Sequence, residues 1–123
     1  MKIDHIAIWA DDIELLRKFY MRYFNMTCND KYVNTRKNFS SYFLSFSEGG
    51  ARLEIMNIPG KDAPAGRGNL KGLAHFTISV GSKENVDDMA RKFKEDGVVI
   101  ITSPAPRATA IMNVSSPTPK GTM

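Results

Sequence analysis

Two histidines and one glutamate are of the residue types that ligate metal ions, and each lies in a stretch that alternates as a strand does. His5 and His75 each lie in the middle of a stretch that alternates with small or apolar side chains. Glu54 lies inside another such stretch, on the same face as Arg52 and Met56. Each of these residues alone is more typical of a strand position that faces water or satisfies a local hydrogen bond. Together, two imidazoles and a carboxylate form a ligand set suited to divalent zinc, nickel, cobalt or iron.

The first half of the chain predicts a strand, a helix and three more strands. Residues 2–10 alternate as a strand does. Asp11 or Asp12 can cap the following helix, because a short carboxylate accepts the unpaired amide protons of the first turn, and the helix should end near Asn25. Residues at helical spacing give this helix its apolar face: Ile13, Leu16, Phe19, Tyr20 and Phe24. Three strands are predicted at about 27–33, 41–46 and 51–56, with a turn at 47–50.

The second half repeats the beginning of the first after a connector at 58–71. A strand is predicted at 72–80, then a helix that Ser82 caps and Gly97 ends, then a buried strand at 98–102, with no further element after Ser103. The segments DHIAIWADDIELLRKFY and AHFTISVGSKENVDDMARKF share the order of strand, cap and amphipathic helix at an offset of 70 residues. His5 and His75 occupy equivalent positions in this repeat. A duplicated ligand position explains how distant residues could meet at one site.

The motifs DHIAI, LEIM and GLAHFTISV resemble the vicinal oxygen chelate superfamily, and within it the glyoxalase I (lactoylglutathione lyase), bleomycin-resistance and dioxygenase group. The resemblance covers about residues 1–107. It implies an α+β fold of paired βαβββ modules that form a cupped mixed sheet around a metal, often in a homodimer. It also implies that His5, Glu54 and His75 are metal ligands and that the metal is nickel, zinc or cobalt.

The glyoxalase pattern within this superfamily implies a lyase that isomerises the hemithioacetal of methylglyoxal and a thiol such as glutathione. In that reaction a carboxylate, here Glu54, moves a proton between adjacent carbons through an enediolate while the cation stabilises the negative charge. Trp9, Arg36 and Tyr42 are the candidate substrate-binding residues.

Three alternatives stay open. The first is a non-catalytic binding protein of the bleomycin-resistance type, for which Trp9, Tyr42 and Phe43 offer aromatic surface. The second is another metalloenzyme of the same superfamily. The third is an unrelated ferredoxin-like α+β domain, which would leave the repeated histidines unexplained.

The tail departs from the rest of the chain. The resemblance implies closing strands with an Asp-Pro-x-Gly hairpin and a final metal-binding glutamate. The second module lacks these motifs, and no acidic residue of any kind follows Asp96. Read one base earlier, the codons of Met112 and Asn113 must encode glutamate, and those of residues 117–122 permit Asp-Pro-Glu-Gly-Asn. Codon freedom makes a chance match the alternative. We interpret residues 108–123 as a frameshifted tail, after module one at 1–57, a connector at 58–71 and module two at 72–107. The loss of the fourth ligand would weaken metal binding and lyase activity.

Composition excludes several other classes of protein. The chain has 123 residues and suits a single domain, and Cys28, its one cysteine, has no intrachain partner for a disulfide. Its longest aliphatic run, at 98–101, is too short to cross a membrane, and we expect a soluble cytoplasmic protein. Arg107 and Lys120 supply half of the net charge of +4, so nucleic-acid binding is not expected.

Overall fold

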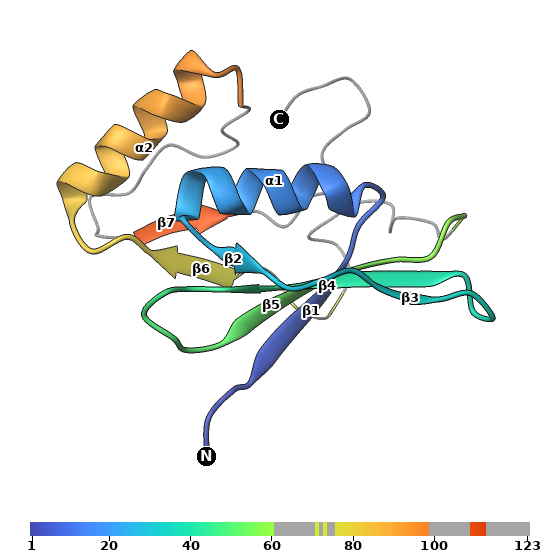
Figure 1. Ribbon diagram of the computed structural model, residues 1–123. Helices are drawn as coiled ribbons and strands as arrows, with labels where there is room; N and C mark the ends of the chain where they lie inside the picture. The colour runs from blue at the N-terminus through green and yellow to red at the C-terminus, as the bar shows by residue number, and fades with distance from the viewer. Residues whose placement is uncertain (61–70, 72, 74–75, 99–108, 113–123) are drawn as a thin grey trace. The chain divides into compact units, whose positions relative to one another are not determined.

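The computed structural model describes residues 1–60, 71, 73, 76–98 and 109–112 (Figure 1). His75 therefore lies outside the described residues, as do most of the predicted connector and residues 99–102 of the predicted buried strand. The chain divides into two compact units, Met1–Asp62 and Ala63–Met123, and each is described by itself. Neither described helix combines the length and the apolar composition that crossing a membrane requires.

The first unit is a mixed five-stranded sheet with one helix. Its elements are β1 (His5–Trp9), α1 (Ile13–Phe24), β2 (Thr27–Cys28), β3 (Tyr32–Asn34), β4 (Phe39–Ser45) and β5 (Arg52–Asn57). The strand order is β1-β5-β4-β2, and β3 also pairs with β4. β1 runs parallel to β5, whereas the other pairs are antiparallel. This is the predicted βαβββ order, except that the strand expected at 27–33 is two short strands.

Local signals place α1 as expected. Of the two candidate caps, Asp12 is the one used, and its side chain accepts a hydrogen bond from the Leu15 amide at 3.0 Å. The helix stops at Asn25, which takes the left-handed conformation (φ 52°) that favours glycine and asparagine. The side chain of Asn57 then fastens the β1–α1 connection by donating to the carbonyl oxygens of Ala10 and Asp11, at 2.8 and 3.2 Å.

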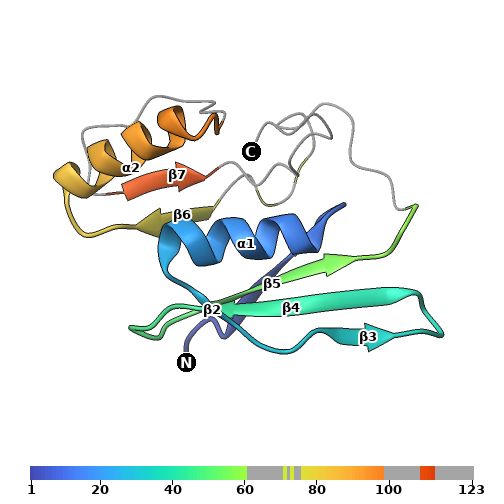
Figure 2. The ribbon, with the colours of Figure 1, turned by 45° about the horizontal axis from the view of Figure 1, so that its top comes forward.

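The core of the first unit lies between α1 and one face of the sheet, and Figure 2 shows the helix lying across β4 and β5. The alternating burial of β5 sends Leu53 and Ile55 into this core, and Leu44 joins them from β4. Leu44 and Ile55 are fully buried. The side chains of Arg52, Glu54 and Met56, which alternate with these, therefore point to the opposite face of the sheet.

The second unit repeats the strand, cap and helix order. β6 (Phe76–Ser79) leads to α2 (Lys83–Glu95), and the Ser82 hydroxyl accepts a hydrogen bond from the Asn85 amide at 3.1 Å, as the predicted cap should. Val86 and Phe93 form the buried face of α2. Gly97 follows the end of α2 with a φ of 75°, in agreement with the prediction that this glycine ends the helix.

One prediction for the tail was wrong. β7 (Thr109–Met112) is a strand that pairs antiparallel with β6, although no element was expected after Ser103. The second module therefore has a strand after its helix, within the residues predicted to be an irregular tail. The stretch contains Thr and Ile, which favour extended structure, but it is too short to show a period of its own. Its pairing with β6 is a long-range contact that local pattern does not reveal.

Candidate functional site

Strand register defines the face of the first sheet that is turned away from α1. In the parallel pair, His5 lies beside Arg52 and Ala7 beside Glu54, so their side chains share this face. Phe43 of β4 lies opposite Glu54 and joins them. We call this surface the distal face. It comprises Tyr32, Phe39, Ser41 and Phe43 together with His5, Ala7, Trp9, Arg52, Glu54 and Met56.

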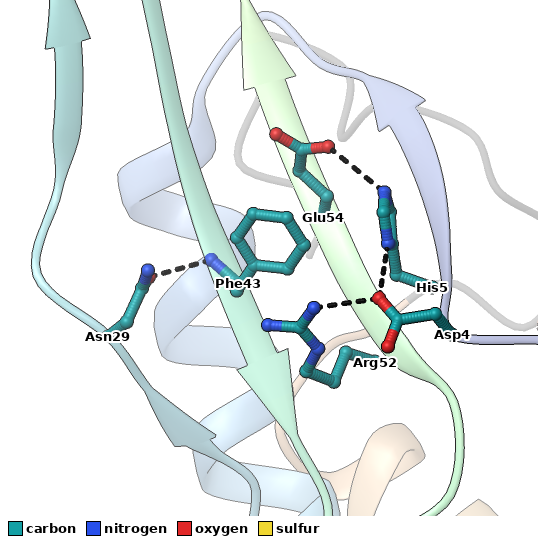
Figure 3. A network of polar contacts seen from close by, with 6 residues as sticks. All are labelled: Asp4, His5, Asn29, Phe43, Arg52 and Glu54. Atoms are coloured by element: carbon teal, nitrogen blue, oxygen red, sulfur yellow. Dashed lines mark hydrogen bonds and ion pairs between the residues drawn. The ribbon is translucent and has the colours of Figure 1, made fainter.

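His5 lies between two carboxylates on the distal face (Figure 3). Its Nδ1 is 2.8 Å from Asp4 Oδ2, and its Nε2 is 3.8 Å from Glu54 Oε1. The His5 and Glu54 side chains are 39% and 16% exposed, so each can be reached by a small ligand. The structure thus brings together the two predicted ligands that it describes.

Asp4 and Arg52 complete this cluster, and the sequence did not identify either as a site residue. Arg52 donates from Nη2 to Asp4 Oδ2 at 2.8 Å, and its guanidinium lies 4.4 Å from the centre of the Phe43 ring. The Phe43 ring in turn meets the His5 ring edge to face at 5.1 Å. Hydrogen bonds from His5 and from Arg52 lower the pKa of the Asp4 carboxyl from 3.8 to about 2, so Asp4 is ionised at neutral pH.

Aromatic rings occupy the other end of the distal face. Trp9 and Phe39 meet edge to face with ring centres 6.2 Å apart, and Tyr32 meets Phe39 at 6.0 Å. Trp9 and Tyr32 are 45% and 55% exposed, which is high for large apolar rings. The distal face therefore combines a charged end around His5 with an apolar, aromatic end around Trp9.

Sequence comparison identifies the family. The profile described as Glyoxalase/Bleomycin resistance protein/Dioxygenase superfamily matches residues 2–114. The chain belongs to this superfamily. No curated protein matches the chain significantly. The profile match extends beyond β7, so the superfamily resemblance reaches further along the chain than the expected 107 residues.

Members of the superfamily often bind metals. Two of the side chains on the distal face are donors that would suit a metal ion. An imidazole nitrogen and a carboxylate oxygen are ligands that zinc and its neighbours accept. Within the described part of the chain, however, no three His, Cys, Asp or Glu side chains are grouped so as to hold a metal ion. His5 and Glu54 supply two donors, and the predicted third, His75, lies outside the described residues.

The three predicted substrate-binding residues of this superfamily member have different positions. Trp9 lies on the distal face with His5 and Glu54. Tyr42 does not, because it pairs with Ile55 and so points to the α1 side of the sheet. There its hydroxyl donates to Glu14 Oε1 at 2.6 Å, which lowers the pKa of Glu14 and raises that of Tyr42. Arg36 is exposed in the turn before Phe39, at the end of β4 away from His5.

Proposed function

We propose that the protein is a metal-dependent lyase of the glyoxalase I type within its superfamily. The observation that carries the proposal is the 3.8 Å approach of His5 Nε2 to Glu54 Oε1 on one partly exposed face. An imidazole nitrogen and a carboxylate oxygen that converge at this distance are both atoms that can ligate a divalent cation. His75, the equivalent of His5 in the second half of the sequence repeat, is the proposed third ligand.

In this proposal Glu54 is the catalytic residue. The bound cation would supply Lewis acidity, which stabilises the negative charge that develops on the substrate oxygens. The Glu54 carboxylate accepts the proton from the carbon that carries sulfur and oxygen in the hemithioacetal. It returns the proton to the adjacent carbon, while the hydroxyl proton passes from the oxygen of the first carbon to the oxygen of the second. The product is an isomer, so no external oxidant or reductant is needed. His5 and Phe43 bound the reacting region on either side of Glu54.

A second candidate function rests on the aromatic end of the distal face. Trp9 and Tyr32 offer exposed rings that each meet the half-buried Phe39 ring, and a flat aromatic ligand could stack on such rings without any metal. This arrangement favours a binding protein of the bleomycin-resistance type. In either case we propose a homodimer in the cytoplasm that acts on a small molecule.

Metal loading and turnover distinguish the two functions. We expect the purified protein to bind nickel, zinc or cobalt, measured by elemental analysis after dialysis. Its isomerisation of methylglyoxal hemithioacetals, measured with several thiols, should be weak because the fourth ligand is missing, and a chain with the restored reading frame should be more active. Activity should disappear on chelation and return with metal. A protein that binds no metal, and whose tryptophan fluorescence responds to aromatic ligands, would be the binder. Bound metal without activity on any thiol would indicate another chemistry of the superfamily.

We also propose that the tail, residues 108–123, is a frameshifted reading of the coding sequence. The shifted frame must encode a glutamate and permits a hairpin motif after it, in the order that the superfamily resemblance implies. Residues 109–112 form β7 in the present frame, so the fold tolerates a strand at this place. Sequencing the coding DNA tests the proposal. We expect a single-base gain or loss near codons 103–108, and an unbroken reading of the present frame in independent isolates would rule it out.

A further inference from the structure

The His5 ring is held from three directions. Asp4 binds its Nδ1 at 2.8 Å, the Phe43 ring packs against it at 5.1 Å, and Glu54 faces its Nε2 at 3.8 Å (Figure 3). The first of these contacts is a hydrogen bond, whereas the last is too long to be one. The two ring nitrogens therefore have different partners and different roles.

The contact with Asp4 determines which nitrogen carries the proton. An ionised carboxylate can only accept hydrogen bonds, so Nδ1 must be the donor in the 2.8 Å contact. A neutral imidazole has one protonated nitrogen, and Nε2 is then left with its lone pair. That lone pair is at the nitrogen nearest to Glu54 Oε1. The ring thus presents an acceptor atom, not a donor, to the carboxylate.

Arg52 holds Asp4 in place for this role. Its Nη2 donates to the same oxygen, Oδ2, that accepts from His5, and its backbone amide donates to the Asp4 carbonyl at 2.9 Å. The Phe43 ring beneath the guanidinium restricts where Arg52 can go. Asp4 is therefore anchored through both its backbone and its side chain to the strand that also carries Glu54.

We propose that Asp4, anchored by Arg52, is a positioning residue that fixes His5 as the Nδ1–H tautomer and aims its Nε2 beside Glu54 as a metal-ligating atom. The inference rests on the proposed function for the identity of the ligand, and it adds residues that the ligand set does not contain. Carboxylates that hold a ligating histidine in this way raise its basicity and fix its orientation.

A purely structural role for Asp4 predicts something different. The Asp4 and Arg52 side chains are 67% and 41% exposed, and exposed ion pairs contribute little to stability. Loss of Asp4 should therefore change the tautomer of His5 while it leaves the melting temperature almost unchanged. This contrast separates positioning from stabilisation.

The test reads the tautomer of His5 in the metal-free protein by ¹⁵N NMR at about pH 8.5, well above the ordinary histidine pKa of about 6.5. A His75→Gln variant assigns the His5 signals. We expect the wild-type ring to be Nδ1–H, and Asp4→Ala to shift it toward Nε2–H. Asp4→Asn keeps an acceptor oxygen and should retain part of the wild-type preference. Zinc affinity should fall about 10–100-fold in Asp4→Ala.

Asp87→Ala is the matched control, because Asp87 is another exposed carboxylate in an ion pair, with Lys83 at 3.0 Å. It should leave the His5 tautomer and zinc affinity unchanged, with a melting temperature similar to that of Asp4→Ala. An Nε2–H wild-type ring, or an Asp4→Ala protein with unaltered tautomer, would overturn the proposal. A wild-type protein that binds no zinc defeats the proposed function instead, since the tautomer is measured without metal.

Discussion

Replacing His5 by alanine, or Glu54 by glutamine, is expected to weaken zinc binding by more than about 100-fold. Loss of a residue that only holds a ligand in place costs up to about 100-fold, and loss of the ligand itself should cost more. His5→Ala removes the imidazole altogether. Glu54→Gln keeps the shape of the side chain but removes the negative charge that attracts a cation. The two changes should be far from additive, since the remaining donor alone makes a poor site. Titration with a competing chelator measures the affinity of each variant.

Glu48→Gln is the control for this prediction, because Glu48 is an exposed acid in the turn between β4 and β5. It removes the same charge without touching the distal face, and its zinc affinity should equal that of the wild type. Equal affinity in all three variants and the wild type would place any bound zinc elsewhere. The case for a lyase centred on Glu54 would then be lost, and the aromatic end of the distal face would become the better candidate site.

Leu44→Ala is expected to lower the free energy of unfolding by about 3 kcal/mol, within the range for replacements of a buried leucine by alanine that leave a cavity in the core. Leu44 has 0% of its surface exposed, and it lies opposite Leu53 in the strand pair that joins β4 to β5. The helix and the sheet cannot close the space without moving α1. Urea denaturation measures the effect, which should appear as a lower midpoint with an unchanged slope.

Val33→Ala provides the comparison for this change. Val33 is 54% exposed on β3, so its truncation should alter the free energy of unfolding by less than about 0.5 kcal/mol. A loss of less than about 1 kcal/mol in Leu44→Ala would mean that the core around β4 is much looser than its burial indicates.

Elements with local signals were predictable, and elements that depend on distant partners were not. The cap at Asp12 and the apolar spacing of α1 lie within one short segment, so the sequence alone places this helix. The break between β2 and β3 has a different origin. Asn29 accepts from the Phe43 amide at 2.8 Å and donates to the Phe43 carbonyl at 3.1 Å, which ends the regular pairing of β2. This exchange depends on β4, which is 14 residues away.

The same distinction applies to the candidate site. The strand positions of His5 and Glu54 were predictable because alternation marks them within their own strands, whereas their role as ligands stays a prediction. Arg52 and Asp4 were not, since their contact requires the parallel register of two strands 48 residues apart. Tyr42 was assigned to the site although it points to the helix. Its neighbour Phe43 takes the distal position, and the sequence of β4 does not reveal which of the two does so.

The candidate site can form only after β1 has paired with β5, because the parallel pairing of these two strands brings its residues together. Contacts between segments so far apart in sequence carry a large loop-closure cost and tend to form late. A slip of one residue in this pairing would send His5 to the α1 side of the sheet while Glu54 stayed on the distal face. Only a chain that has completed the correct pairing can offer both donors to one cation. Metal held by His5 and Glu54 would therefore be selective for the correctly registered fold, and would stabilise it against every other arrangement of β1.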